Sequence, residues 1–135
     1  DLATRAHPAP VTNVPTSCGI EDQVSMGATE ARHVEEMVDD VEQILALELL
    51  VAAQAITLRQ RILAGAWPPK DQDGFDGSAN ATLGRGTAAA MDHLRSLVPE
   101  RVDDGEMTGD VGAIAAAIQS GSLLAAVEAA TGPLR

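Results

Sequence analysis

The chain has 135 residues, of which 45% are hydrophobic, so it can bury the core of one domain or of one part of a larger domain. Nine Lys and Arg stand against 20 Asp and Glu, and the resulting net charge of -11 argues against nucleic acid and anionic membrane surfaces as partners. The sequence contains no Tyr, and Cys18 is its single cysteine. One cysteine excludes an internal disulfide framework and a cysteine-rich metal site, and it suits a cytoplasmic location.

The first 20 residues predict a loop segment. Pro8, Pro10, Pro15 and Gly19 fall in this stretch, and together they discourage any long helix. The sequence starts at Asp1 with neither an initiator Met nor a signal-peptide pattern. We therefore expect a cut inside a longer chain.

Residues 21–64 predict one long helix, which we expect to begin at about residue 22, because residues 22–63 contain no Pro and a single early Gly. In its first half, apolar side chains recur every three or four residues: Val34, Met37, Val38, Val41, Ile44 and Leu45. Residues 45–56 contain only Glu48 and Gln54 as polar side chains, so this part must be surrounded. It is too short, and carries Glu48 too centrally, for a transmembrane span.

The length of this helix is itself informative. About 40 helical residues extend roughly 60 Å at 1.5 Å per residue. A compact domain of this chain length has a diameter of roughly 35 to 40 Å. We therefore expect the helix to need neighbours from outside the chain.

The remaining sequence predicts a connection followed by short helices. Residues 65–86 are rich in Gly and Pro and predict a flexible loop. Residues 87–135 predict C-terminal short helices at 87–98, 110–120 and 123–130, because Thr87 and Asp110 are good N-caps while Pro99 and Gly121 stop helices. The predicted fold class is all-α, a long central helix with shorter C-terminal helices.

Residues 14–27 form the most informative segment, Val-Pro-Thr-Ser-Cys-Gly-Ile-Glu-Asp-Gln-Val-Ser-Met-Gly. Its loop delivers Glu21 and Asp22 to the predicted start of the long helix. There the backbone N–H groups and the macrodipole favour a carboxylate, so Glu21 could hold an ammonium group or take up a proton. The alternative is plain capping and charge complementarity, because acids are common in first helical turns.

This segment resembles Pro-Thr-Ser-Ala-Asn-Gln-Glu-Asp-His-Val-Ser-Met-Gly, which is typical of histidine ammonia-lyases and of related bacterial tyrosine lyases and aminomutases. Further likenesses follow in the same order: residues 45–50 resemble the family's Leu-Ala-Ile-Glu-Leu-Leu, and residues 52–59 resemble its Ala-Ala-Gln-Ala-x-x-Leu-Arg. His7-Pro8-Ala9 resembles the family's leader, and residues 86–99 and 110–121 resemble its closing helices. The resemblance spans essentially the whole chain.

The resemblance implies a larger helical-bundle enzyme of the L-aspartase/fumarase-like type, a homotetramer whose active sites combine loops from three subunits around a methylidene-imidazolone (MIO) electrophile. Its reaction would be elimination of ammonia from an aromatic amino acid of the histidine, tyrosine or phenylalanine class, or migration of the amino group. The family forms MIO from Ala-Ser-Gly, and the nearest approach here is Gln119-Ser120-Gly121. We therefore expect MIO and the family's Tyr base to come from the N-terminal part of the same enzyme, with no metal, and this chain to be inactive alone.

Glu21 aligns with the family's active-site Glu, so the resemblance implies that Glu21 is catalytic and lies near the substrate's amino group or ring. Gly19 and Ile20, the candidate substrate-binding residues beside it, replace the family's common Asn and Gln, and Gln23 stands where histidine lyases have His. These changes remove hydrogen-bonding capacity, so the substrate can differ from histidine, or the copy can have lost activity.

Other readings of the sequence remain open. Cys18 has no adjacent His or basic residue, which favours a loop filler over a nucleophile. His7, His33 and His93 lack metal-ligand spacing. A second hypothesis for the whole chain is a non-catalytic helical oligomerisation or regulatory module derived from the same family.

Overall fold

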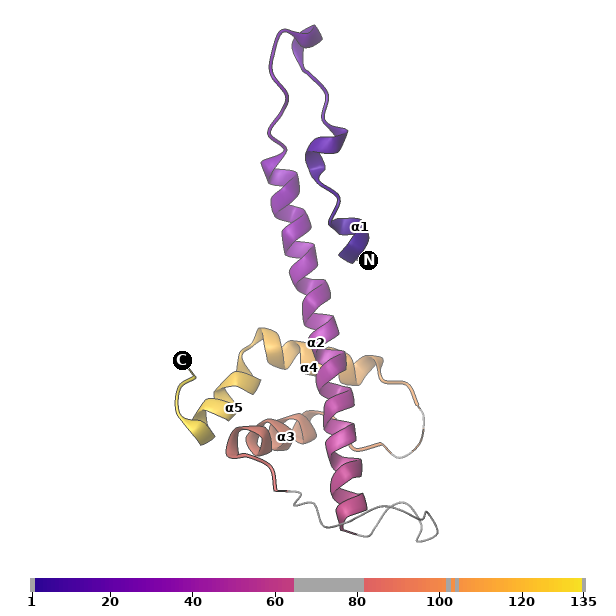
Figure 1. Cartoon of the computed structure of the whole chain (residues 1–135), viewed down its shortest axis with the longest axis vertical. Coiled ribbons are helices and arrows are strands. Elements are labelled where there is room, and N and C mark those ends of the chain that lie inside the picture. The colour runs from indigo at the N-terminus through magenta and orange to yellow at the C-terminus, as the bar shows by residue number, and fades with distance from the viewer. Residues whose placement is uncertain (1, 65–81, 102, 104, 135) are drawn as a thin grey trace. The chain divides into compact units, whose positions relative to one another are not determined.

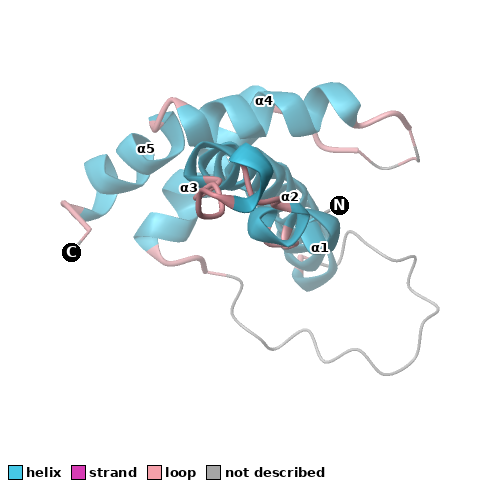
Figure 2. Ribbon diagram, turned by 90° about the horizontal axis from the view of Figure 1, so that it is seen from above, coloured by secondary structure: helices cyan, strands magenta, loops and turns pink. Residues whose placement is uncertain are grey.

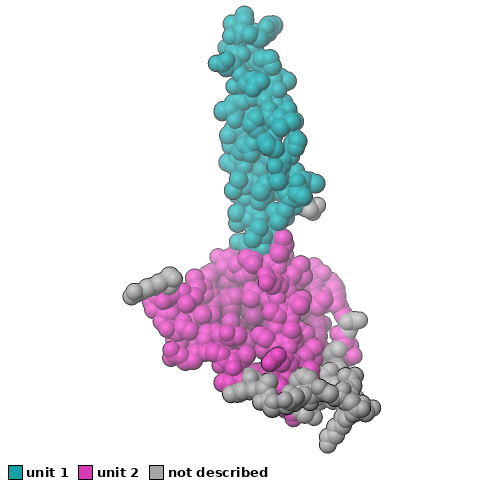
Figure 3. All heavy atoms as spheres, viewed as in Figure 1, with its two compact units in different colours: residues 1–42 teal, residues 43–135 magenta. Residues whose placement is uncertain are grey.

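The computed structural model describes residues 2–64, 82–101, 103 and 105–134, and the chain divides into two compact units, residues 1–42 and 43–135 (Figure 3). The described elements are α1 (Leu2–Arg5), the short 3-10 turns η1 (Ala9–Thr12) and η2 (Ser17–Gly19), α2 (Gly27–Leu63), α3 (Arg85–Leu97), α4 (Thr108–Gln119) and α5 (Ser122–Thr131) (Figure 1). No strand occurs in these described ranges, which confirms the predicted all-α class.

In the first unit, the segment before α2 folds back along the beginning of that helix (Figure 1). Arg5 forms ion pairs with Glu36 and, at 2.9 Å, with Asp40. Further along, the Ala9 N–H donates to Glu30 Oε1 at 2.7 Å. The partners run in opposite directions along the chain, so the leader and α2 form an antiparallel pair held by polar contacts.

The helix α2 begins at Gly27, five residues after the start expected from sequence. Two features delay it: Pro15 and Gln23 form an isolated antiparallel bridge, and Met26 adopts a left-handed backbone with φ of 55°. A left-handed residue cannot sit inside a right-handed helix, so the helix starts after Met26. The absence of Pro and Gly from residues 22–26 was not enough to predict helix there.

The second unit has a core of small and aliphatic side chains. Its buried members come from α2, α3 with its C-cap, and α4: Ala46, Leu50, Ala53, Met91, Leu94, Val98, Ile114 and Ala115. The alanines let helices approach closely in a chain with almost no aromatic residues. Gly86 serves the same purpose, because a Cβ built there would lie 3.2 Å from Thr131 Cγ2 of α5. Figure 2 shows α3, α4 and α5 gathered beside α2.

The predicted short helices are confirmed, with shifted ends. α3 starts at Arg85 and α4 at Thr108, each two residues earlier than expected. Gly84 rather than Thr87 occupies the N-cap of α3, and Met107 rather than Asp110 occupies that of α4. Gly121 joins α4 to α5 with a left-handed φ of 72°, as its helix-stopping character predicts. Residues 65–81 of the predicted flexible loop lie outside the described residues, while Arg85 and Gly86 already belong to α3.

Arg101 anchors the start of α4. Its Nε and Nη2 donate to Asp110 Oδ2 at 2.8 and 2.7 Å, and this hydrogen bond and charge raise the pKa of Arg101 above its ordinary value. Asp110 lies in the first turn of α4, where the N-terminal N–H groups also favour a negative charge. Asp110 therefore links the turn before α4 to the helix itself.

Much of the apolar surface of α2 stays uncovered by the described residues. An 18-residue window of this helix has a mean hydropathy of 1.6 and is 17% buried, so length and composition alone would allow a membrane span, which corrects the expectation that the apolar part is too short for one. α4 and α5 pass the same test only as a pair, across a bend of 63°. The core helix of a multi-helix soluble protein also has this composition. The composition therefore shows that these apolar side chains need to be covered, but not whether protein or lipid covers them.

The core predicts a sharp difference between two similar truncations. Ile114 is 0% exposed, so Ile114→Ala should lower the free energy of unfolding by roughly 2–5 kcal/mol through lost burial and a cavity. Leu124→Ala, at a side chain that is 50% exposed, should change it by less than about 0.5 kcal/mol. Urea denaturation followed by circular dichroism measures both. Equal effects would contradict the described core.

Candidate functional site

The predicted site residues lie together on one exposed loop, residues 15–23, which we call the Glu21 loop. Its two ends meet at the Pro15–Gln23 bridge. Just outside this bridge, Asn13 Nδ2 donates to the carbonyl oxygen of Val24. The loop therefore has a closed base.

The tip of the Glu21 loop is a tight turn with three consecutive left-handed residues. Ser17, Cys18 and Gly19 have φ of 50°, 56° and 84°. The carbonyl oxygen of Thr16 accepts hydrogen bonds from the N–H groups of Gly19 at 3.0 Å and Glu21 at 3.4 Å. Left-handed backbone costs non-glycine residues roughly 1–2 kcal/mol each, so the turn stores strain.

Glu21 does not occupy a helix N-terminus, which corrects the electrostatic argument made from sequence. α2 starts six residues later, and the macrodipole effect falls off within the first turn. The acid in the first turn of α2 is Glu30. Capping by Glu21 and Asp22 is therefore wrong as well, and the surroundings of Glu21 come from its own loop.

The carboxylate of Glu21 is held by a side chain within the loop. Thr16 Oγ1 donates to Glu21 Oε2 at 3.0 Å, and Glu21 is otherwise exposed. A hydrogen bond to an ionised acceptor is stronger than one between neutral groups. The arrangement presents one oriented carboxylate at the surface of the first unit.

Gly19 and Ile20 lie beside Glu21 and are also exposed. Ile20 is 87% exposed, and its N–H donates to the Ser17 carbonyl oxygen at 3.1 Å. The N–H of Gly19 is already used by Thr16, so Gly19 offers a substrate only its carbonyl oxygen. Substrate binding by these two residues remains a prediction.

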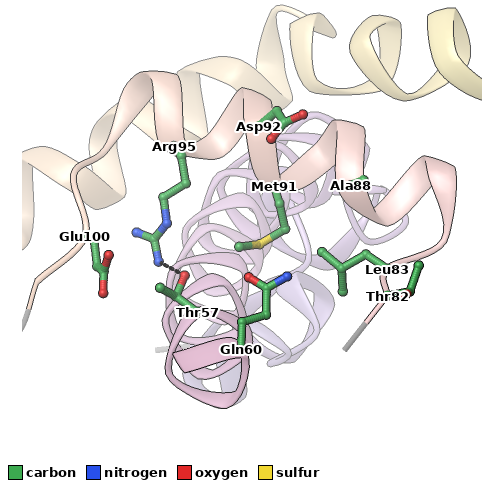
Figure 4. Close-up of a pocket in the computed structure, with 9 residues that line it drawn as sticks. All are labelled: Thr57, Gln60, Thr82, Leu83, Ala88, Met91, Asp92, Arg95 and Glu100. Atoms are coloured by element: carbon green, nitrogen blue, oxygen red, sulfur yellow. Dashed lines mark hydrogen bonds between the residues drawn. The ribbon is translucent and has the colours of Figure 1, made fainter. Parts of the chain in front are cut away.

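A separate hollow of about 680 Å³ lies in the second unit, between α2 and α3 (Figure 4). Its most prominent polar group is Arg95, whose Nη2 donates to Thr57 Oγ1 at 2.8 Å and to the Ala53 carbonyl oxygen at 3.0 Å. Its Nη1 donates to the Pro99 carbonyl oxygen at 3.2 Å. Because these donors serve protein acceptors on α2 and after α3, Arg95 joins the two helices.

Sequence reasoning did not single out Arg95, although a signal was present. Arg95 follows Met91 by four residues and adjoins Leu94, so it falls at the edge of the buried face of α3. A charged residue in that position needs partners. Among the described residues, no group of three or more His, Cys, Asp or Glu is arranged to hold a metal ion. His93 instead lies 3.1 Å from Ser122 Oγ through its Nε2.

Comparison with known proteins places these observations in a family. The aromatic amino acid lyase profile matches residues 1–96. Histidine ammonia-lyase from Sorangium cellulosum (strain So ce56) is 38% identical over 95% of this chain, and the one from Stigmatella aurantiaca is 40% identical over 93%. A third, from Gloeobacter violaceus, is 37% identical over 96%. The chain belongs to the aromatic amino acid lyase family.

The match covers a limited part of those relatives. The chain spans 21% of the length of each of these three proteins. No solved structure was found to match the chain. The profile match and the three relatives confirm the resemblance seen in the sequence as family membership.

The hydrogen bonds of Arg95 predict that removing its guanidinium lowers the free energy of unfolding. Arg95→Met keeps an unbranched side chain but removes the donors to Thr57, Ala53 and Pro99, so unfolding should become easier by roughly 1–3 kcal/mol. Arg59→Met, at an exposed position of α2, should have little effect. Urea denaturation compares the two variants, and an unchanged midpoint for Arg95→Met would remove Arg95 from the helix pairing.

Proposed function

We propose that this chain is the C-terminal segment of an ammonia-lyase of the histidine class and that Glu21 is its contribution to the active site. Family membership supports the reaction class. The observation that carries the proposal for Glu21 is its carboxylate, exposed on a loop with a closed base and oriented by the Thr16 hydroxyl. Such a group is accessible to a substrate or to another subunit.

Glu21 suits the part of this reaction that involves the amino group. A carboxylate can hold a substrate ammonium group through charge-assisted hydrogen bonds, or accept one of its protons as the carbon–nitrogen bond breaks. The Thr16 hydroxyl donates to Oε2, which leaves Oε1 as the other acceptor of this carboxylate. We assign Oε1 to the substrate.

The residues of this chain do not fit the formation of MIO. Gln119-Ser120-Gly121 lacks the Ala of the family's triplet, Ser120 Oγ donates to the Ala117 carbonyl oxygen at 3.4 Å, and Gly121 is the left-handed link between α4 and α5. We propose that MIO, which supplies an electrophile in this family, forms in the N-terminal part of the same enzyme, together with the missing Tyr base. The chain alone is then inactive.

The substrate class follows from the family and from the loop. We propose an aromatic α-amino acid, with histidine as the first candidate because the relatives named above are histidine ammonia-lyases. Ile20 and Gln23 depart from the pattern of histidine lyases, so phenylalanine and tyrosine remain candidate substrates beside histidine. An aminomutase uses the same substrates and differs by returning the amino group to the neighbouring carbon.

The exposed apolar side chains of α2 support a proposed homotetramer. In residues 27–42 they are Val34, Val38 and Val41, and in residues 43–63 they are Ile44, Leu45, Leu47 and Val51. Full burial of a fully exposed side chain of this size contributes roughly 1.5–3 kcal/mol, so covering each of these partly exposed side chains contributes a fraction of that. We propose that other helices of the enzyme cover them, in a soluble cytoplasmic protein, and that lipid does not.

The catalytic role of Glu21 is tested by Glu21→Gln in the complete enzyme. The substitution removes the charge and barely alters shape, so turnover should fall at least tenfold, a loss of about 1.4 kcal/mol or more in transition-state stabilisation. Product formation from L-histidine, L-phenylalanine and L-tyrosine is followed by ultraviolet absorbance.

Glu35→Gln, the same chemical change on an exposed face of α2, is the matched control and should retain normal turnover. An unimpaired Glu21→Gln enzyme would withdraw Glu21 from the site, whereas an unaltered complete assembly without turnover of any of the three amino acids would favour the non-catalytic module.

The tetramer proposal predicts different outcomes at two neighbouring positions. Val38 is 52% exposed in this chain, and Val38→Lys should place a charge in the covered interface and lower the assembled mass. Asp39→Lys introduces the same side chain on the polar face and should leave the mass unchanged. Light scattering after size-exclusion chromatography of the complete enzyme measures it. A Val38→Lys tetramer would argue against this interface.

A further inference from the structure

We propose that Thr16 is a positioning residue for the Glu21 carboxylate, an inference that rests on the catalytic role proposed for Glu21. Thr16 contacts Glu21 at two separate places. Its carbonyl oxygen accepts the Glu21 N–H at 3.4 Å, and its hydroxyl donates to Glu21 Oε2 at 3.0 Å. One residue therefore fixes both the backbone and the acidic group of Glu21.

The side-chain contact restricts a group that would otherwise move. An exposed glutamate has three rotatable side-chain bonds, and ordering such a side chain costs conformational entropy. Holding one carboxylate oxygen in advance reduces what a substrate must order on binding. The hydroxyl itself is well placed to do this, because a β-branched Thr has few χ1 rotamers.

The surrounding loop keeps Thr16 and Glu21 at this separation. Pro15 and Gln23 close the base, while the Gly19 N–H donates to the Thr16 carbonyl oxygen at 3.0 Å across the turn. Thr16 is only partly exposed, in contrast to its neighbours Ser17 and Cys18. The loop thus holds the Thr16 hydroxyl in place, and this hydroxyl orients the Glu21 carboxylate.

The two contacts of Thr16 can be separated by substitution. The turn uses the carbonyl oxygen, which any residue supplies, whereas the carboxylate uses the hydroxyl. Thr16→Val retains the backbone acceptor and the β-branched shape and removes only the hydroxyl. Thr16→Ser retains the hydroxyl and removes a methyl group.

The test is a double-mutant cycle in the complete enzyme, assayed with L-histidine, L-phenylalanine and L-tyrosine. Thr16→Val should lower kcat/KM about three- to tenfold, with an unchanged melting temperature, and Thr16→Ser should restore at least half of the lost activity. In a Glu21→Ala background, adding Thr16→Val should change kcat/KM by less than about twofold, because no carboxylate remains to be positioned.

The outcomes separate this inference from the proposed function. Loss of activity in Glu21→Ala combined with normal activity in Thr16→Val overturns the positioning role and leaves Glu21 catalytic. Normal activity in Glu21→Ala overturns the proposed function itself. Independent, multiplicative losses, or a Thr16→Ser variant as impaired as Thr16→Val, show that Thr16 acts through loop shape and also overturn the inference.

Discussion

The structure depends on a helix whose apolar surface exceeds what the described chain covers. In residues 43–63 of α2, only Ala46, Leu50 and Ala53 are buried, although most of the neighbouring side chains are also apolar. A helix that is apolar nearly all round requires surroundings on every side. The chain spans 21% of its relatives' length, so additional protein in such an enzyme is a sufficient source of that cover.

The shortage of aromatic side chains shapes how the second unit packs. Its core relies on Ala46, Ala53 and Ala115, and on Gly86 where α3 meets α5, so the helices gain contact by approaching closely. Close approach also brings the Arg95 guanidinium within reach of the α2 backbone at Ala53. A charged side chain can then tie two helices together at the margin of a small apolar core.

The long helix and the short helices were predictable because their apolar residues recur with helical spacing and their ends carry Gly or Pro. The five-residue error at the start of α2 has a tertiary origin. Gln23 pairs with Pro15 and Met26 turns left-handed, and neither event leaves a mark in local helix propensity. The same limit applies to the Thr16–Glu21 hydrogen bond, which exists because the intervening turn reverses the chain.

The catalytic role that the family resemblance implies for Glu21 stays a prediction, whereas the helix N-terminus that periodicity predicted around it is wrong. An acid at a helix N-terminus draws its stabilisation from many aligned peptide dipoles. An acid in the Glu21 loop draws it from one hydroxyl, which a single substitution removes. The polar surroundings of the Glu21 carboxylate therefore come from the Thr16 side chain and not from a helix.

The loop geometry also separates two sequence departures that looked alike. Gly19 replaces the family's common Asn at a φ of 84°, and Gly and Asn are the residues that most readily adopt left-handed backbone. That exchange preserves the turn.

Ile20 replaces Gln in an ordinary right-handed conformation and leaves an apolar side chain 87% exposed next to Glu21. An apolar neighbour that becomes covered in the assembly would lower the local dielectric around the carboxylate and strengthen its attraction for an ammonium group. Of these two departures, Ile20 is therefore the one that we predict to affect substrate binding.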